Sequence, residues 1–464
     1  MDKTIITQLQ KIVGSGQIST SREERLCYSY DSTGREFLPE AVVFPGSTEE
    51  ISRIMQLAFR ERFSVVPRGA GSGATGGALP TAGGLVMALS RLNRIIEIDP
   101  DNMIAVAEPG VITADLQKAV RRLGLFYPPD PASRTFCSLG GNVAECAGGP
   151  SAVKYGVTRD YVLGLEAVLA DGRIIHTGVR TAKGVVGYDL TRLLVGSEGT
   201  LAVITRMTLR LLAVPPEKST FLLLFDAMAA ATGFVASLLK QHTPCTLEYM
   251  DRTAIDLVRE ELPLQMPPET RALLLVELDG EKEMLAIQSD RLVTFLADTP
   301  GLLQTLTAAE EDHDTLWAAR RKLSAASFKL RPHKINEDVV VPRNRIPELV
   351  GFTEKLARDL DIPIFTFGHA GDGNIHVNIM VDKTDTAELR KGETAKKLLF
   401  EQVLALGGTL SGEHGIGLTK SAYINMEIDP DTLKLMRQIK AVFDPHNILN
   451  PGKIFPDENS ESGL

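Results

Sequence analysis

The sequence predicts an α+β protein, because strand-like and helix-like segments alternate irregularly along the chain. Residues 1–215 contain short apolar runs of strand length, punctuated by glycine and proline. Residues 217–412 alternate longer strand-like runs with long helical runs. Of the 464 residues, 44% are hydrophobic and 23% are charged, which is typical of a globular protein with a large core.

The elements of the first part follow from its apolar pattern. An amphipathic helix is expected at the N-terminus, where Ile5, Leu9 and Ile12 fall on one face. Thr48, Glu49 and Glu50 are expected to cap the next helix. Strands are expected at 42–45, 64–67, 85–89, 95–98 and 104–107, and helices at 48–62 and 113–123.

The composition changes at Val214-Pro215-Pro216, which indicates a domain boundary. Beyond it the pattern predicts strands at 220–225 and 273–278, helices at 227–241, 282–297 and 430–443, and a strand–turn–strand unit at 365–381. The last residues, 456–464, are expected to be disordered. We therefore expect a first domain at 1–215, a second at 216–415, and a segment at 416–464 that returns to the first.

Charge and cysteine content exclude several classes of protein. The formal charge of −9 argues against a broad nucleic-acid-binding surface. The four cysteines, Cys27, Cys137, Cys146 and Cys245, form no CxxC pair, which argues against a disulfide framework or an iron–sulfur cluster. Without an apolar signal segment or a run of membrane-spanning length, we expect a cytoplasmic protein, with docking on a membrane partner left open.

A glycine-rich segment at 68–84 contains GxGxxG at residues 71–76. A dinucleotide-binding loop of the Rossmann type must open a helix, yet Pro80 and the pair Gly83-Gly84 follow. The alternative is a loop whose exposed backbone amides form an anion-binding nest. For this segment alone, the local pattern favours an ordinary surface loop.

Three further segments, at 138–150, 155–172 and 196–205, favour the cofactor-binding interpretation instead. Together with 67–77 and in this order, they resemble the vanillyl-alcohol oxidase/PCMH family of FAD-linked oxidases. The resemblance implies a PCMH-type FAD-binding domain of two α+β subdomains, and a substrate (cap) domain with an antiparallel sheet flanked by helices. It implies FAD contacts for Arg68, Gly69, Ala70, Gly71, Ser72, Gly73, Gly76, Pro131, Ser138, Gly141, Asn142, Glu145, Gly148, Gly156, Gly199, Val203, Asn450 and Lys453.

Within this family, a covalent flavin link often uses a histidine in the first loop or a cysteine in the second region. The first loop here contains no histidine, so non-covalent FAD is expected. Cys146 lies among the expected flavin contacts and keeps a covalent link open. For Asn450 and Lys453, an ordinary turn is as consistent with the local pattern.

A second group of residues suggests a metal centre. His369 and His376 flank the turn signal Asp372-Gly373-Asn374, so they are expected on adjacent strands. Glu413 and His414 follow between two glycines. Two imidazoles and a carboxylate suit Zn, Mn or Fe(II). The alternative is that the histidines only satisfy hydrogen bonds in a polar hairpin.

These two motifs, GHAGDGNIH and GEHG, resemble the flavin-dependent D-2-hydroxyacid dehydrogenase subgroup, which includes D-lactate dehydrogenase and the glycolate oxidase FAD subunit. The resemblance implies that His369, His376 and Glu413 hold a divalent metal and that His414 is the catalytic base. Oxidation of a 2-hydroxy acid needs such groups, because the hydroxyl proton is too weakly acidic to leave unaided at neutral pH. Flavin would accept the hydride.

The substrate carboxylate also needs a cation, and a guanidinium offers bidentate contact. By resemblance this residue is Arg320, whereas Arg321 points about 100° away on the same expected helix and is interpreted as a surface charge. Some relatives have a second cation before the strand near residue 337. Here Asn336 occupies that place and Lys334 lies two residues earlier, so this contact is left open between them.

The leading interpretation is an FAD- and metal-dependent dehydrogenase that converts a D-2-hydroxy acid, D-lactate or glycolate, to the 2-oxo acid. Electrons would pass to a separate acceptor, such as an iron–sulfur subunit, an electron-transfer flavoprotein or a quinone. One alternative is a non-catalytic flavin-binding subunit of a multi-protein oxidase, and another is a metallohydrolase without flavin. A homodimer is also considered, and no nucleic-acid partner is expected.

Overall fold

The protein is described by a computed structural model that covers residues 1–262 and 265–456, and its chain divides into two compact units. The first unit comprises Met1–Gly148, Val157–Val214 and Glu413–Leu464, and the second comprises Gly149–Gly156 and Pro215–Gly412. Residues 149–156, which the sequence analysis assigns to the first domain, thus belong to the second unit. Residues 457–464, where disorder is expected, lie outside the described residues.

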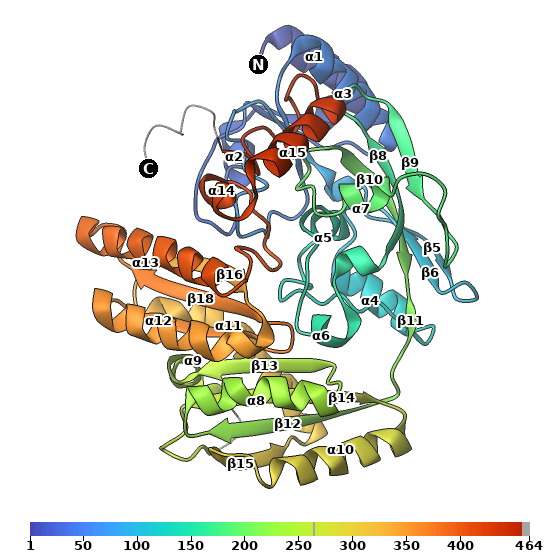
Figure 1. Ribbon diagram of the computed structural model, residues 1–464. Coiled ribbons are helices and arrows are strands. Elements are labelled where there is room, and N and C mark those ends of the chain that lie inside the picture. Colours follow the sequence, from blue (N-terminus) through green and yellow to red (C-terminus); the bar gives the residue numbers. More distant parts are fainter. Residues whose placement is uncertain (263–264, 457–464) are drawn as a thin grey trace. The chain divides into compact units, whose positions relative to one another are not determined.

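The described part of the first unit contains two main sheets (Figure 1). One has the strand order β1-β2-β4-β3, in which β4 runs parallel to β2 and β3 while β1 is antiparallel. The other has the order β5-β6-β10-β8-β9 and is antiparallel throughout; β7 and β11 form a separate ribbon. The strands are β1 (Ile18–Ser19), β2 (Ala41–Val43), β3 (Val65–Arg68), β4 (Leu85–Ala88), β5 (Ile95–Asp99), β6 (Ile104–Ala107), β7 (Leu125–Phe126), β8 (Val162–Val168), β9 (Ile174–Gly178), β10 (Val203–Arg210) and β11 (Leu212–Ala213).

The helices of this unit pack their apolar sides on the sheets. Leu9 of α1 and Ile54 of α3 join Val43 and Met87 in one buried core, which the amphipathic patterns of both helices predict. The helices are α1 (Lys3–Val13), α2 (Arg22–Cys27), α3 (Thr48–Glu61), α4 (Thr113–Arg121), α5 (Leu139–Glu145), α7 (Leu190–Leu194), α14 (Ile424–Glu427) and α15 (Pro430–Phe443). Short 3-10 turns lie at Ser15–Gln17, Leu89–Arg91, Thr158–Asp160 and Ser421–Tyr423.

The start of α3 differs from the sequence prediction. Ser47, not Thr48, is the N-cap, and its hydroxyl accepts a hydrogen bond from the Glu50 amide at 3.2 Å. The helix is followed by its C-cap Arg62, which adopts a left-handed conformation. The expected helix therefore exists, and its cap lies one residue earlier than the local pattern indicates.

Helix α5 is not expected from sequence, because Gly140 and Gly141 lie inside it and glycine disfavours helices. A Cβ atom at residue 140 would stand 2.5 Å from the Cβ atom of Pro109, so close packing against the preceding loop requires glycine here. Ser138 caps the helix by accepting a hydrogen bond from the Gly141 amide at 3.3 Å. Tertiary packing thus overrides the local helix propensity.

No described residue between 69 and 84 is helical, in agreement with the rejection of a Rossmann loop. Glu97, at the spacing of a ribose-binding acid, lies within β5 and forms an ion pair with Arg180 at 2.7 Å. The chain instead passes from β3 through the glycine loop to β4. The loop is therefore an irregular segment between two parallel strands.

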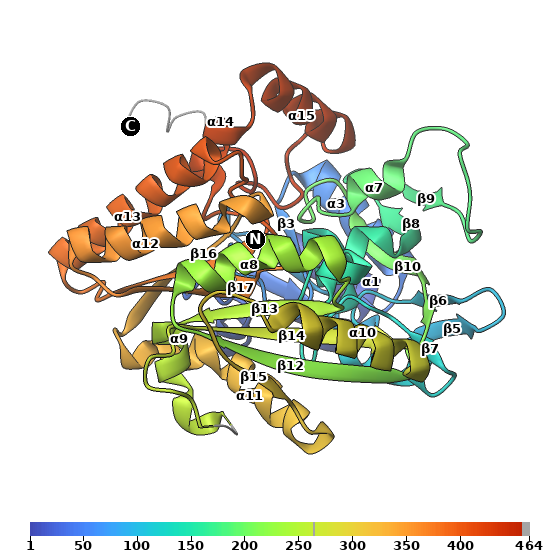
Figure 2. The ribbon, with the colours of Figure 1, turned by 60° about the horizontal axis from the view of Figure 1, so that its bottom comes forward.

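The second unit is built on a sheet whose described strands follow the order β15-β12-β14-β13-β17-β18-β16, antiparallel throughout. Helices α8, α10, α12 and α13 cover one face, and α9 and α11 cover the other (Figure 2). The strands are β12 (Glu217–Phe225), β13 (Thr246–Asp251), β14 (Ala272–Gly280), β15 (Leu302–Thr307), β16 (His333–Val340), β17 (Ile364–His369) and β18 (Asn374–Val381).

The helices of the second unit include the two that the sequence predicts after β12 and β14. They are α6 (Ala152–Tyr155), α8 (Met228–Gln241), α9 (Arg252–Leu257), α10 (Lys282–Leu296), α11 (Glu310–Ala326), α12 (Ile346–Leu360) and α13 (Thr386–Ala405), with 3-10 turns at Arg259–Glu261, Ser327–Lys329 and Arg343–Arg345. Within the described chain, no helix combines the length and the apolar character that crossing a membrane requires.

Candidate metal and flavin site

The two motif histidines lie on one hairpin. His369 ends β17 and pairs with Asn374, while His376 pairs with Phe367. Side chains two residues apart on a strand share a face, so the two histidines are diagonal neighbours on the same face of the sheet. Their Nε2 atoms are 3.4 Å apart. The predicted strand–turn–strand geometry is therefore present.

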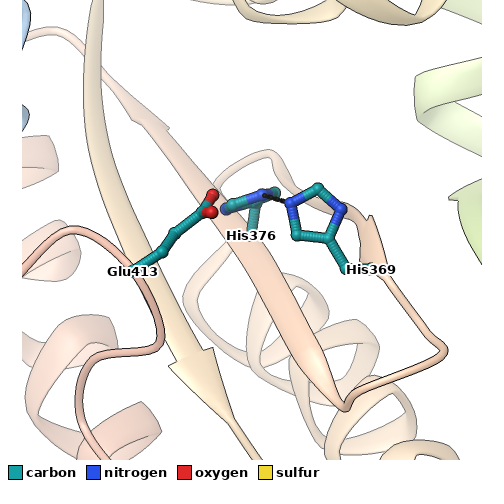
Figure 3. A group of neighbouring side chains, drawn as sticks. All are labelled: His369, His376 and Glu413. Atoms are coloured by element: carbon teal, nitrogen blue, oxygen red, sulfur yellow. Dashed lines mark hydrogen bonds between the residues drawn. The ribbon is translucent and has the colours of Figure 1, made fainter. Parts of the chain in front are cut away.

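Glu413 joins the two histidines. One ligand atom from each of His369, His376 and Glu413 lies within 4.8 Å of the other two (Figure 3). Figure 3 shows the Glu413 carboxylate directed toward the imidazole rings. The three predicted metal ligands, which come from two separate motifs of the sequence, thus converge.

The donor set fits a divalent metal. Metal–nitrogen bonds to histidine are about 2.0–2.1 Å long, so two such nitrogens on one tetrahedral ion stand roughly 3.4 Å apart. The separation of the two Nε2 atoms has this value. Two imidazoles and one carboxylate leave further coordination positions for other ligands, as catalytic metal sites do.

A buried carboxylate that the sequence analysis does not single out stands behind His369. Glu248 of β13 is 1% exposed, accepts a hydrogen bond from His369 Nδ1, and pairs with Arg320. Burial opposes ionisation of this carboxyl, but the charges and hydrogen bonds of His369 and Arg320 outweigh burial, and the pKa of Glu248 lies below its usual value. A single acidic residue inside the apolar segment TLEYM is the sequence signal that could identify it.

A second buried carboxylate, Asp338 of β16, lies directly opposite His376 in the strand register. It accepts hydrogen bonds from the Asn374 side chain at 2.5 Å and from the Ser411 hydroxyl at 3.2 Å. It also accepts one from the Gly412 amide at 3.0 Å, next to Glu413. Asp338 therefore fixes the backbone from which Glu413 projects.

The predicted carboxylate clamp, Arg320, lies on the inner face of α11. Its Nε atom donates to Glu248 Oε2 at 2.8 Å, and its Nη2 atom forms an ion pair with the same oxygen at 2.6 Å. The guanidinium carbon lies over the ring of Phe367, 4.4 Å from the ring centroid. Within residues 1–262 and 265–456, no acceptor is assigned to Nη1. The neighbouring Arg321 is exposed, as the helical geometry predicts.

Lys334 and Asn336, the alternatives for a second substrate contact, both lie on β16. Because side chains alternate along a strand, Lys334, Asn336 and Asp338 all lie on the same face of β16. Lys334 donates to the Ser324 hydroxyl at 2.7 Å, and burial lowers its pKa to about 8. Asn336 lies opposite Asn378 in the register, nearer to His376.

The predicted base, His414, is half-buried and belongs to the segment that opens the returning part of the first unit. Its carbonyl oxygen accepts a hydrogen bond from the Thr75 hydroxyl at 3.0 Å. Glu198 accepts hydrogen bonds from the amides of Ile416 and Gly417 at 2.8 and 2.7 Å. Thr75 and Glu198, which the sequence analysis does not assign, thus attach the His414 segment to the glycine-rich regions.

The glycine loop has the features of an anion-binding nest. Gly71 and Gly76 adopt φ values of 70° and 87°, which favour glycine. In the described part of the chain, no hydrogen-bond acceptor is assigned to the backbone amides of residues 70–78. Unpaired amides on a loop of this kind suit a pyrophosphate. The loop therefore fits the phosphate portion of FAD.

Three predicted cofactor contacts instead use their side-chain donors to shape the loop. Arg68 donates to the carbonyl of Tyr30 at 2.7 Å. Asn450 donates to those of Gly77 and Glu198 at 2.9 and 2.7 Å, and Lys453 donates to that of Leu79 at 2.7 Å. All three side chains are buried, and burial lowers the pKa of Lys453 to about 8. The Asn450 Oδ1 atom is buried and has no partner among the described residues.

The remaining predicted cofactor contacts are divided between two environments. A Cβ atom at Gly69 would stand 2.2 Å from the Ser138 hydroxyl, so the loop touches the start of α5, which carries Gly141 and Asn142. Asn142 donates to Thr113 at 2.6 Å. By contrast, the side chain of Val203 lies in the apolar core and Gly156 belongs to the second unit, so neither joins this group in the first unit. The carbonyls of Ser72 and Gly73 accept hydrogen bonds from the hydroxyl and amide of Ser32 at 3.1 and 3.3 Å. The other expected contacts are Ala70, Pro131, Gly148 and Gly199.

Two acidic side chains lie close together beneath the loop. Glu198 is 5% exposed, and the Oε2 atom of Glu145, a predicted cofactor contact, is buried. Burial and the charge of Glu198 raise the pKa of Glu145 well above its usual value. Burial also raises the pKa of Glu198. The hydrogen bonds from the amides of Ile416 and Gly417 and the charges of Lys453 and Lys420 lower it by less. At least one of the two carboxyls is therefore favoured in its neutral form.

Known families match most of the chain. FAD linked oxidases, C-terminal domain, match residues 214–454, and the FAD binding domain family matches residues 39–178. The chain is 42% identical to glycolate oxidase subunit GlcD of Bacillus subtilis, over 98% of this chain and 97% of that protein. It is 38% identical to D-lactate dehydrogenase of Archaeoglobus fulgidus, over 92% of this chain and 95% of that protein.

Solved structures resemble the fold at lower identity. p-Cresol methylhydroxylase matches with a TM-score of 0.82 and 18% identity, over 99% of this chain and 97% of that chain. 4-Ethylphenol oxidase from Gulosibacter chungangensis matches with a TM-score of 0.78 and 21% identity, over 98% of each chain. These likenesses confirm the predicted α+β, PCMH-type fold. Together with the sequence matches, they establish that this chain belongs to the family of FAD-linked oxidases, as an FAD-binding oxidoreductase.

Proposed function

We propose that this protein oxidises a D-2-hydroxy acid, D-lactate or glycolate, to the corresponding 2-oxo acid. The observation that carries the proposal is the convergence of His369, His376 and Glu413 in a chain that belongs to a flavin-dependent family. The names of the relatives, glycolate oxidase subunit and D-lactate dehydrogenase, support the same substrate class. A non-catalytic flavin subunit would have no chemical need for this ligand set.

In this proposal, some protein residues bind the substrate and one accepts its proton. Arg320 would bind the substrate carboxylate through the guanidinium edge that Glu248 leaves open. His414 would accept the hydroxyl proton at a ring nitrogen, because the unprotonated nitrogen of a neutral imidazole carries a lone pair. Either Lys334 or Asn336 would contact the substrate tail, since both share the strand face of Asp338.

His369, His376 and Glu413 would hold the divalent metal, for which Zn, Mn and Fe(II) all suit the donors. When bound, the metal would supply a Lewis acid that lowers the pKa of the substrate hydroxyl, and FAD would supply the hydride acceptor. The first unit would serve as the FAD-binding domain and the second as the substrate domain.

We further propose that FAD binds without a covalent link. Burial raises the pKa of the Cys146 thiol, so the nucleophilic thiolate is scarce at neutral pH. The amides of residues 70–78 would bind the pyrophosphate. The other predicted contacts, apart from Val203 and Gly156, would line or shape the rest of the cofactor site.

The reduced flavin must be reoxidised by a separate acceptor. We propose an iron–sulfur subunit, an electron-transfer flavoprotein or a quinone, because the four free cysteines of this chain do not form a cluster site. The name of the Bacillus subtilis relative, a glycolate oxidase subunit, supports a protein acceptor. A cytoplasmic location and a homodimer remain part of this proposal.

An anaerobic flavin-reduction panel tests the proposal. The purified protein is mixed with D-lactate, L-lactate, glycolate and D-2-hydroxyglutarate, and flavin absorbance is followed with time. Bleaching by a D-2-hydroxy acid or glycolate is expected, and treatment with a chelator should abolish it. Lack of bleaching by every acid would contradict the proposed reaction, whereas unchanged bleaching after complete metal removal would exclude the metal from it.

A further inference from the structure

Glu248 contacts two groups to which the proposed function gives different tasks. Its Oε1 atom accepts from His369 Nδ1, and its Oε2 atom accepts from Nε of Arg320 and forms an ion pair with Nη2 of the same guanidinium. The side chain is 1% exposed, so water does not compete for these contacts. One carboxylate therefore links a metal-ligand histidine with the residue proposed to bind the substrate carboxylate.

The chemistry of this contact determines the state of the imidazole. An ionised carboxylate only accepts hydrogen bonds, so the Nδ1 atom of His369 must carry the hydrogen that it donates. In a neutral imidazole the other nitrogen, Nε2, then carries a lone pair. Nε2 is the atom of His369 that faces His376, 3.4 Å away.

The same carboxylate determines which part of Arg320 is available. It contacts the edge formed by Nε and Nη2, and the cation–π contact with the Phe367 ring restrains the guanidinium. The edge formed by Nη1 and Nη2 keeps the fork geometry that matches a carboxylate.

We propose that Glu248 is a positioning residue that holds His369 as the Nδ1–H tautomer, with Nε2 as a metal ligand, and holds Arg320 with its outer edge toward the substrate. This inference rests on the proposed metal site. Carboxylates behind metal-ligating histidines act in this way in other proteins, and their loss typically weakens metal binding about 10- to 100-fold.

The isosteric variant Glu248→Gln tests the tautomer directly. Arg320 can only donate, so the amide oxygen of glutamine is expected to face Arg320 and its NH2 group to face His369. His369 Nδ1 must then accept, which moves the imidazole hydrogen to Nε2 and removes the lone pair that binds metal. We expect the affinity for Zn²⁺ or Mn²⁺, measured by competition with a chromogenic chelator on the full FAD-loaded protein, to fall about 10- to 100-fold.

Glu277 provides a matched control. It is also 1% exposed, lies on β14 on the same face of the sheet, and accepts hydrogen bonds from His313 at 2.7 Å and Trp317 at 2.9 Å, both on α11. Glu277→Gln therefore removes a buried charge under the same helix without touching the proposed ligands. Metal affinity should stay at the wild-type value in Glu277→Gln.

The outcomes separate a positioning role from a structural one. Wild-type affinity in Glu248→Gln would overturn the inference, and so would an equal loss of affinity in both variants, because the effect would then come from the fold. A loss in Glu248→Gln alone supports it.

A second measurement keeps the inference separate from the metal proposal. In metal-free protein labelled with ¹⁵N-histidine, at a pH where imidazoles are neutral, long-range ¹H–¹⁵N spectra identify the tautomer. The His369 signal is assigned as the one missing in His369→Asn. We expect Nδ1–H in the wild type and Nε2–H in Glu248→Gln. Failure of the wild type to bind metal would contradict the proposed metal site, whereas Nε2–H in the wild type would overturn the inference.

Discussion

Asp338 accepts a hydrogen bond from the amide of Gly412 at 3.0 Å, one residue before Glu413. The same carboxylate holds the side chain of Asn374, at the start of the strand that carries His376. A Cβ atom at residue 412 would stand 2.4 Å from the Asn374 Nδ2 atom, so the close approach requires glycine. One buried carboxylate thus connects the segments that carry two of the three proposed metal ligands.

Replacing Asp338 with asparagine should weaken both the fold and metal binding. The new NH2 group would face donors from Asn374 or Gly412, leaving a buried donor without a partner at a cost of about 1–3 kcal/mol. We expect a lower melting temperature and a weaker affinity for Zn²⁺ or Mn²⁺. Asp382→Asn, at a surface carboxylate of the same unit, is the control. Unchanged metal affinity in Asp338→Asn would argue against its role in placing Glu413.

Replacing Arg320 with lysine should impair substrate binding more than chemistry. Lysine keeps the charge that pairs with Glu248 but loses the fork needed for bidentate contact with a carboxylate. A charge-assisted hydrogen bond contributes about 1.5–3 kcal/mol, so KM for the 2-hydroxy acid should rise roughly 10- to 100-fold with kcat less affected. Arg321→Lys, at the exposed neighbouring position, should leave KM unchanged. Equal KM values in the two variants would exclude Arg320 as the clamp.

Glu277 should make the stability of the protein sensitive to acid. Burial opposes its ionisation, but hydrogen bonds from His313, Trp317 and Lys218, together with the Lys218 charge, lower its pKa to about 2. Because the folded pKa lies below the unfolded value of about 4.3, the ionised carboxylate stabilises the fold at pH values above about 4.3. This contribution, on the order of 3 kcal/mol, is lost as the pH falls from about 4.3 toward 2.

Thermal melting between pH 7 and pH 3 checks this expectation. The difference in melting temperature between the wild type and Glu277→Gln should shrink as the pH falls below about 4.3, because the unfolded wild type takes up a proton there while the folded side chain stays ionised down to a pH of about 2. A difference that stays constant over this range would show that the charge of Glu277 does not contribute.

FAD should leave the protein on denaturation. With no histidine in residues 68–84 and a thiol of raised pKa at Cys146, a covalent link is not expected. Acid precipitation should release all of the yellow flavin into the supernatant, and Cys146→Ser should bind FAD at the wild-type stoichiometry. A yellow pellet in the wild type that turns colourless in Cys146→Ser would identify Cys146 as the attachment point.

The sequence predicts elements well where a local pattern determines them. The hairpin at 365–381 follows from two apolar runs around Asp372-Gly373-Asn374, and the observed strands place both histidines on one face. The helix expected at 430–443 has those bounds in α15, where Asp429 is the N-cap and Pro430 occupies the first helical position. These features need no information from distant residues.

Long-range packing explains what the sequence does not reveal. Helix α5 contains glycines that local propensity disfavours, and only the contact with Pro109 explains them. Glu248 meets Arg320 and His369 from 72 and 121 residues away, so no local motif contains all three. Glu198 and Asp338 likewise bind backbone amides that lie far along the chain.

The short turn between β17 and β18 determines the spacing of the two histidine ligands. His369 pairs with Asn374, which leaves residues 370–373 to reverse the chain. Because side chains alternate between the faces of a strand, a shift in pairing by one residue would turn one imidazole to the opposite face. Insertions and deletions in this turn are therefore constrained more tightly than its surface-like composition suggests, since the length of the loop itself encodes the separation of the two nitrogens.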